Sequence, residues 1–257
     1  RGMVPHDYDI TTSARPEEVA AAFCGRTLIE TGLKHGTQTL HSGGMDLEIT
    51  TFRTDGVYED HRHPAAVTFA RTLEEDLARR DFTINAMAYH PQCGLVDLFG
   101  GEADLAAGVI RCVGNAMERF SEDALRMLRA VRFAAQLGFS IEQETQEAIA
   151  GLAGNIKKVS AERIQVELVK LLTSPNPGEL KVAYRMGLTA VFLPEFDVMM
   201  ETPQNNPHHC CSVGEHTLKA IEAVPADKVL RLTMLLHDIV KPACRTTDKK
   251  GVDHFYG

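Results

Sequence analysis

The apolar residues change their spacing near residue 116. Before it, short β-prone runs predict strands at 8–11, 37–40, 46–52 and 96–99, and helical spacing predicts helices at 16–23 and 82–89. After it the strand pattern ends, and apolar residues at helical spacing predict helices at 121–137, 142–152, 160–173, 177–187, 214–223 and 226–239. The sequence therefore predicts an α+β part followed by an all-helical part.

Breaks in this pattern divide the chain into three units. Gly100-Gly101 follows the last strand signal and predicts a hinge, and the polar run 203–209 predicts a linker. We therefore expect domains at 1–115, 116–202 and 203–257, with a mobile polar loop at 54–64. Because neither end shows a terminal element, we also expect the chain to be a piece of a longer protein.

Composition narrows the class of protein. The 257 residues are 44% hydrophobic and 24% charged, which is typical of an ordinary globular protein. No apolar run approaches the roughly 20 residues needed to span a bilayer, and no secretory signal opens the chain. The six cysteines have no CxxC spacing, which excludes the usual zinc and disulfide frameworks. We expect a cytoplasmic protein without a membrane partner.

The net charge of −8 argues against indiscriminate binding of nucleic acid, which depends on neutralising phosphates. It leaves room for a local basic surface. Arginine and lysine pairs at 79–80 and 157–158, together with Arg163 and Lys170, could supply such a surface.

Asp7 and Asp9 form a DxD pair on the first predicted strand. Residues i and i+2 of a strand face the same side, so the two carboxylates repel unless a cation lies between them. Carboxylate oxygens suit Mg²⁺, which binds them together with substrate phosphates. Glu48, on the predicted strand 46–52, is placed to supply a third acid. A polar strand face is the alternative interpretation of these acids.

Arg79, Arg80 and Asp81 precede the predicted helix 82–89. Adjacent arginines at a helix start suit phosphate, because their forked donors add to the free N–H groups and the dipole of the helix. Asp81 is placed to cap that helix. The alternative for the two arginines is a solvated pair of loop charges.

Asp123, Arg126 and Arg129 recur at intervals of three in the predicted helix 121–137, so they would share one stripe, with Arg132 at its edge. A carboxylate beside a guanidinium group offers acceptors and fixed donors in one plane, which can hydrogen-bond the edge of a nucleobase. The alternative is a solvated helical ion pair that stabilises the helix by about 0.2–0.5 kcal/mol.

The order of these motifs resembles the tRNA nucleotidyltransferase and poly(A) polymerase family, and more narrowly its bacterial class II CCA-adding enzymes. DxD, RRDFTINAMA, DLFGG and EDxxRMLRAxRF carry the resemblance, which runs from about residue 5 to 257. It implies a polymerase-beta-like nucleotidyltransferase head with a mixed sheet, followed by an all-helical neck and body. It also implies addition of C, C and A to the 3′ end of tRNA from CTP and ATP, with Mg²⁺ and without a nucleic-acid template.

The resemblance assigns roles to single residues. Asp7 and Asp9 would hold the catalytic magnesium ions. The phosphates and sugar of the incoming nucleotide would be bound by Arg80 and Asp81, with Asn85 nearby. Asp123 and Arg126 would read the Watson–Crick edges of CTP and ATP, with Glu122 orienting them, and further contributions to nucleotide binding would come from Arg129 and Arg132.

One element of the family pattern is missing from the printed sequence. The family has a Gly-Gly-x-x-Arg-Asp turn before DxD that contacts the nucleotide, and here only Arg1-Gly2-Met3 stands in that region. The resemblance to the family does not depend on this turn, but we expect the activity of the chain to depend on it.

The third unit carries His216 and the pair His237-Asp238, which resemble the HD superfamily of metal-dependent phosphohydrolases. Imidazole and carboxylate groups suit transition metals. The HD pattern needs a final aspartate farther downstream. His254 is a candidate for an additional metal ligand, and the alternative is that it is an ordinary loop histidine. We expect a truncated helical HD-like domain that serves structure or contacts RNA.

Several alternatives remain open. A poly(A) polymerase, or a CC- or A-adding enzyme, would share the same motifs. Two alternatives belong to other classes. One is an HD phosphohydrolase whose head is degenerate, and the other is an RNA-binding module without catalysis. The complete DxD and EDxxR motifs favour the transferase over both. We expect tRNA to be held through shape and phosphate contacts. The sequence does not determine the oligomeric state.

Overall fold

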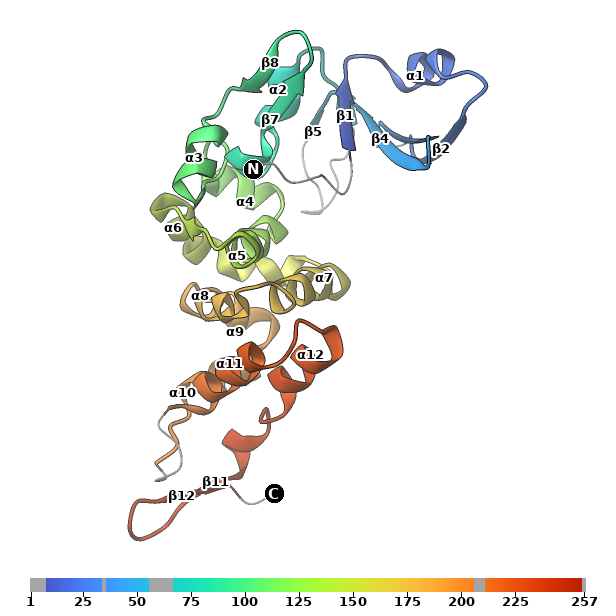
Figure 1. The fold of residues 1–257 in the computed structure, drawn as a ribbon. Helices are drawn as coiled ribbons and strands as arrows, with labels where there is room; N and C mark the ends of the chain where they lie inside the picture. The colour runs from blue at the N-terminus through green and yellow to red at the C-terminus, as the bar shows by residue number, and fades with distance from the viewer. Residues whose placement is uncertain (1–7, 34–35, 56–66, 206–210, 256–257) are drawn as a thin grey trace.

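The computed structural model describes residues 8–33, 36–55, 67–205 and 211–255. The chain forms an elongated molecule, with a small sheet at one end, stacked helices in the middle and a hairpin at the other end (Figure 1). The structure confirms the predicted fold class of an α+β head with a mixed sheet and a mostly helical remainder.

The head is built on a four-stranded sheet with strands Tyr8–Thr12 (β1), Met45–Thr51 (β4), Thr37–Ser42 (β3) and Thr27–Gly32 (β2), in this spatial order. The pair β1–β4 is parallel and the other pairs are antiparallel. Helix α1 (Pro16–Ala22) covers one face, where Val19 packs with Leu40 and Ile49. Because strand residues alternate between faces, Asp9 and Glu48 lie on the opposite face.

The described residues in the second half of the head form two small strand pairs, two short helices and a further strand. They are β5 (Arg53–Asp55) with β6 (Val67–Phe69), α2 (Leu73–Ala78), β7 (Met87–His90) with β8 (Gly94–Asp97), α3 (Gly101–Ala107) and β9 (Val109–Ile110). The predicted helix 82–89 is wrong. A single 3-10 turn at Thr83–Asn85 leads into β7, because pairing with β8 outweighs the helical spacing of the apolar residues. Most of the predicted loop 54–64 lies outside the described residues.

The predicted helix 121–137 is interrupted. It consists of α4 (Ala116–Glu122) and α5 (Leu125–Leu137), and Asp123 between them has an extended backbone with φ −137° and ψ 103°. Its Oδ1 accepts a hydrogen bond from the backbone N–H of Leu125 at 3.1 Å, an alternative to helical pairing that aspartate readily adopts. Asp123 therefore does not share a helical stripe with Arg126 and Arg129.

The remainder is mainly helical, with α6 (Gln143–Leu152), α7 (Ala161–Leu172), α8 (Leu180–Arg185), α9 (Thr189–Phe192), α10 (Pro194–Glu201), α11 (Val213–Ala223) and α12 (Lys228–Leu236). Short strands also occur after residue 116, against the prediction: β10 (Ser140–Ile141) pairs with β9, and β11 (Arg245–Thr247) pairs with β12 (Asp253–Phe255). No helix in the described ranges is long and apolar enough to cross a membrane. The predicted domain boundaries stay a prediction.

Helix α5 lies at the centre of the main core. Met127, Leu128 and Val131 are completely buried, and the aromatic ring of Phe82 from the head packs edge-on against Phe133 at 5.8 Å between ring centroids. The core therefore extends from the head into the helices. This continuity holds the segments around residues 80 and 126 against each other.

A buried ion pair joins α5 to α7. The side chains of Arg132 and Glu167 are only 9% and 6% exposed. Burial lowers the pKa of Arg132 and the Glu167 carboxylate opposes that shift. We expect Glu167→Ala to lower the free energy of unfolding by about 3–5 kcal/mol in urea titrations, because it leaves the Arg132 charge buried without its partner. The exposed Glu144→Ala, as the control, should change it by less than about 1 kcal/mol; equal effects of the two variants would contradict this account.

Candidate functional site

The acidic residues lie on the open face of the head sheet. Asp9 on β1 and Glu48 on β4 are register partners in the parallel pair, so their side chains are neighbours on one face. Both residues are exposed. Asp7, the other acid of the predicted pair, lies outside the described residues. Two adjacent, accessible carboxylates fit a hard cation such as Mg²⁺, which prefers oxygen ligands.

Arg79 and Arg80 lie at the end of a helix and not at the start of one, against the prediction. Helix α2 begins after Thr72, whose side chain and that of Glu75 form a capping box. It ends at Ala78, with Arg79 as its C-cap. This Thr-x-x-Glu signal was present in the sequence and marks the helix start. Arg80 Nη1 donates to the carbonyl of Asn85 at 3.1 Å, and 32% of the Arg80 side chain stays exposed.

Asp81 contacts two other residues that were predicted to bind nucleotide, Asn85 and Arg129. Its Oδ1 accepts from Asn85 Nδ2 at 3.0 Å and from the Phe82 N–H at 2.9 Å, while its Oδ2 accepts from Arg129 Nε at 2.8 Å. Burial raises the pKa of Asp81, but Arg129 and these hydrogen bonds lower it below its ordinary value. The group is therefore an anion at neutral pH, with acceptors only.

Asp123 and Arg126 are both held by protein partners. Asp123 Oδ2 accepts from Arg163 Nη2 of α7 at 2.7 Å. Arg126 Nη1 donates to Glu122 Oε2 at 2.9 Å, and its Nη2 donates to the carbonyl of Arg79 at 3.0 Å. The contact from Glu122 fixes the direction of the Arg126 guanidinium, and the contact to Arg79 brings it to the end of α2.

Arg129 and Arg132 differ in access. One third of the Arg129 side chain (33%) is exposed beside Asp81. Arg132 is buried, donates to Gln136 Oε1 at 2.8 Å and lies 3.8 Å from the Phe133 ring centroid. A ligand could reach Arg129 more easily than Arg132.

Three contributors to this region were missed in the sequence. Asp76 is buried and contacts both Arg79 and Arg80, and its spacing of four from Arg80 on an acidic helix was a usable local signal. Arg119 pairs with Glu122 three residues along α4, another local signal. Arg163 lies 40 residues from Asp123, and no local pattern identifies that pair.

A cavity of about 420 Å³ lies apart from these residues. It opens between α4 and α6 and is lined by residues that include Arg111, Asn115, Glu142 and Thr145. None of the predicted nucleotide-binding residues lines it. The candidate site therefore lies apart from this cavity, where the head meets α5.

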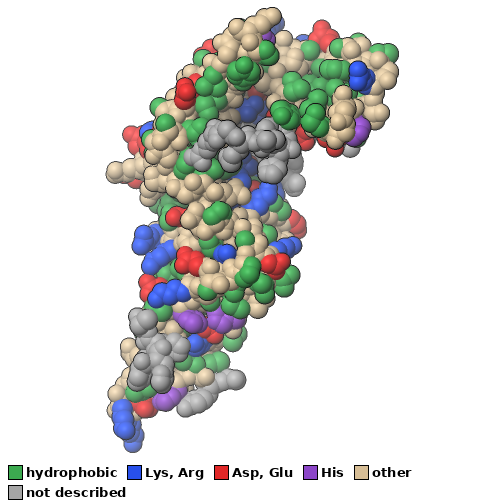
Figure 2. Space-filling model, in the orientation of Figure 1, with side chains coloured by type: hydrophobic (Ala, Val, Ile, Leu, Met, Phe, Trp, Pro, Cys, Tyr) green, Lys and Arg blue, Asp and Glu red, His purple; other side chains and the backbone are tan. Residues whose placement is uncertain are grey.

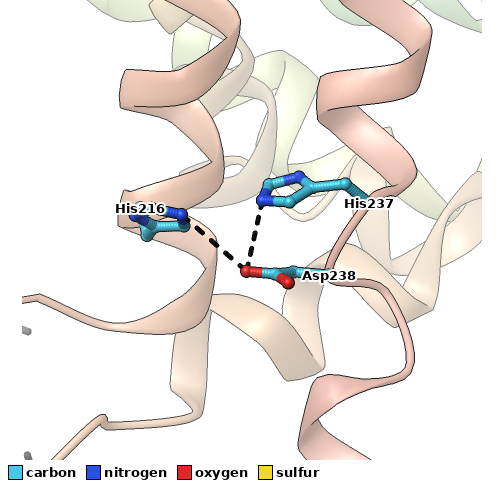
Figure 3. Close-up of side chains that lie close together, drawn as sticks. All are labelled: His216, His237 and Asp238. Atoms are coloured by element: carbon cyan, nitrogen blue, oxygen red, sulfur yellow. Dashed lines mark ion pairs between the residues drawn. The ribbon is translucent and has the colours of Figure 1, made fainter.

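A second cluster lies near the other end of the molecule, where Figure 2 shows several histidine side chains. His216 on α11 and His237 at the end of α12 both face Asp238 (Figure 3). Asp238 Oδ2 lies 3.2 Å from His237 Nε2 and 3.8 Å from His216 Nε2, and the three ligand atoms lie within 4.8 Å of one another. His254 lies on β12, where it contacts Asp248 at 3.4 Å, and is not part of this cluster.

Comparison with known proteins agrees with these motifs. Residues 2–111 match the model of the poly A polymerase head domain, and residues 138–200 match a probable RNA and SrmB-binding site of polymerase A. The CCA-adding enzyme of Leuconostoc mesenteroides is 51% identical over 185 residues, or 72% of this chain and 46% of that protein. The CCA-adding enzyme of Lactiplantibacillus plantarum is 52% identical over 176 residues, 68% of this chain and 43% of that protein. The chain thus spans less than half the length of these relatives.

Solved structures extend the similarity into the helical part. The match to the Bacillus stearothermophilus CCA-adding enzyme in complex with CTP covers 94% of this chain and 56% of that enzyme's chain. The TM-score is 0.74 and the sequence identity is 36%. A tRNA nucleotidyltransferase complexed with a primer tRNA and an incoming ATP analogue covers 92% of this chain and 68% of its own, at a TM-score of 0.66 and 26% identity. The chain belongs to the tRNA nucleotidyltransferase and poly(A) polymerase family, as the resemblance of its motifs predicted.

Proposed function

We propose that this chain is part of a cytoplasmic enzyme that adds C, C and A to the 3′ end of tRNA from CTP and ATP. The observation that carries the proposal is the contact between the two sequence motifs. Asp81 pairs with Arg129, and Arg126 donates to the Arg79 carbonyl. These contacts support the proposal because they bring the segment proposed to bind phosphate beside the helix proposed to hydrogen-bond the base.

The residues of the head supply the chemistry of nucleotidyl transfer in this proposal. Asp9 and Glu48, together with Asp7, would hold Mg²⁺, which would supply charge neutralisation at the reacting phosphate. Arg80 and Arg129 keep part of their donors accessible and bind the triphosphate. With the metal and the nucleotide held in this way, the protein contributes mainly position and charge.

Asp123 and Arg126 select the base in this proposal. Arg126 is a fixed donor because Glu122 and the Arg79 carbonyl restrict its guanidinium group. Asp123 is a fixed acceptor because Arg163 holds its carboxylate. A wrong base would leave buried polar groups unpaired, and such a loss costs about 1–3 kcal/mol.

In this proposal the chain has three domains, at 1–115, 116–202 and 203–257. The helical part, which follows the head, binds tRNA. Figure 2 shows Lys and Arg side chains interspersed with acidic ones along this part, and Lys157 and Lys158 are exposed. A duplex RNA stem exposes phosphates and 2′-hydroxyl groups and little readable sequence, so dispersed basic contacts suffice.

Incorporation of labelled nucleotides tests the function. With Mg²⁺ and tRNA lacking its 3′ end, the protein carrying the Gly-Gly-x-x-Arg-Asp turn upstream should add two C and one A. Asp9→Asn should lower the rate by about 100-fold or more, because a metal ligand is lost. Glu17→Gln is the control, because it removes an exposed carboxylate on α1, on the other face of the sheet. Its rate should stay within about twofold of the unchanged protein.

Each other product has a defined meaning. Long A tracts would move the assignment to a poly(A) polymerase, and addition of only C or only A would move it to a partial enzyme of the same family. Absence of any incorporation would refute the transferase.

Base choice tests the proposed template. Asp123→Ala and Arg126→Ala should reduce the preference for C over U by about 10–100-fold, since each removes a polar partner of the base. The half-saturating Mg²⁺ concentration should change little. Arg119→Ala, which removes another partner of Glu122, serves as the arginine control and should keep base choice. Equal loss of activity with unchanged selectivity would contradict the template role.

His216, His237 and Asp238 support a second proposal, a transition-metal site in the C-terminal part. His237 Nδ1 lies 2.7 Å from the Met234 carbonyl, so a proton on Nδ1 leaves Nε2 free as a ligand. Nε2 of both histidines and Oδ2 of Asp238 then converge. An imidazole and carboxylate set of this kind suits a transition metal.

Metal content tests this site. After incubation with Mn²⁺ and gel filtration, the protein should retain about one metal ion per chain in elemental analysis. His216→Ala and Asp238→Asn should each abolish retention, while His90→Ala, an exposed histidine of the head, should not. Hydrolysis of bis-p-nitrophenyl phosphate by the metal-loaded protein would show that the site is a phosphohydrolase. Equal metal retention in all variants would rule out the metal site.

A further inference from the structure

Asp76 on α2 is a buried carboxylate with an unusual number of partners. Its side chain is 1% exposed. Oδ1 accepts from the Arg53 N–H at 3.2 Å and from Arg79 Nε and Nη2 at 3.1 and 2.8 Å. Oδ2 accepts from Thr11 Oγ1 at 3.3 Å and from Arg80 Nη2 at 3.4 Å. A buried carboxylate requires such donors, so its partners are held in place by it.

These partners belong to different parts of the proposed site. Thr11 is two residues from Asp9 on β1 and therefore lies on the same face of the strand. Arg80 is the arginine proposed to bind the triphosphate. A single oxygen, Asp76 Oδ2, thus links the strand that carries the metal-binding acids to the phosphate-binding arginine.

Arg79 extends this connection to the template helix. Its Nε also donates to the Arg53 carbonyl at 3.0 Å, and its own carbonyl accepts from Arg126 Nη2 at 3.0 Å. The side chain of Arg79 is therefore held by Asp76 while its backbone holds Arg126. Asp76 is thereby linked to the DxD strand, to the two arginines of the RRD motif and, through Arg79, to Arg126 of the template helix. It is itself buried.

We propose that Asp76 is a positioning residue that sets the distance between the metal-binding acids and the nucleotide-binding arginines. The inference rests on the proposed transferase function. Transfer requires the RNA hydroxyl and the triphosphate to be held in a narrow geometry, and a misplacement of about 1 Å can cost about 100-fold in rate. Burial raises the pKa of Asp76, but Arg79, Arg80 and the Arg53 N–H lower it below its ordinary value, so the carboxylate is an anion at working pH.

A merely structural role would lower stability and leave the kinetics of the folded protein unchanged. Asp76→Asn keeps the shape, removes the charge and turns one acceptor into a donor that faces other donors. Below its melting temperature, we expect the variant to lose about 100-fold in kcat for C addition. We further expect the half-saturating Mg²⁺ concentration to rise severalfold while the preference for C over U is kept.

Asp104→Asn is the matched control. Asp104 is also buried and also pairs with an arginine, Arg111, and it accepts from Thr83 Oγ1 at 2.7 Å. Its neutralisation should lower the melting temperature to a similar extent and leave the half-saturating Mg²⁺ concentration within about twofold. An Asp76→Asn protein with this same profile would overturn the inference.

Thr11→Val provides a second, milder test should Asp76→Asn fold poorly. It removes only the hydroxyl donor and leaves the arginines in place. We expect a higher half-saturating Mg²⁺ concentration with a near-normal KM for CTP, and an effect that is not additive with Asp76→Asn. An unchanged Mg²⁺ response, or full additivity, would overturn the inference. A protein that carries the Gly-Gly-x-x-Arg-Asp turn and the otherwise unchanged sequence, yet has no transferase activity, would refute the proposed function itself, and the inference with it.

Discussion

The ion pair between Asp81 and Arg129 joins two segments that lie 48 residues apart, and the candidate site is formed where these segments meet. Asp81 is buried, so loss of Arg129 would leave its carboxylate without its charged partner and would destabilise the fold. The same approach of the head to α5 brings Arg126 to the Arg79 carbonyl. The apolar contact of Phe82 with Phe133 accompanies these polar contacts.

The arginines in this region keep different amounts of accessible charge. Arg80 and Arg129 have about a third of their side chains exposed, at 32% and 33%, whereas Arg126 and Arg132 have 10% and 9%. Exposed guanidinium groups can gain phosphate partners without losing their carboxylates, because each carries five donors. Buried ones serve better as fixed donors or as structural charges. Anion binding is thus compatible with a chain whose net charge is −8.

Local sequence patterns predicted helices and strands well where the spacing of apolar residues matches the face that is buried. The apolar spacing in α6, α7 and α11 identified these helices to within a few residues, and the strand pattern identified β3 and β4. The prediction failed at 82–89, where β7 takes its conformation from its partner β8. It also failed at Asp123, where a side-chain hydrogen bond to Leu125 interrupts the helix.

The sequence by itself determined the family, the fold class and the residue types of the candidate site, because these follow from motifs of consecutive residues. Only the tertiary structure decided which partner each charged group meets. Asp123 pairs with Arg163 of another helix, Arg132 with Glu167, and Asp76 with a threonine 65 residues away. The physical reason is that an ion pair needs proximity in space, and chain spacing predicts it only within a helix turn or between register neighbours. Burial, which decides whether such a charge supports the fold or reaches a ligand, is likewise a property of the packed molecule.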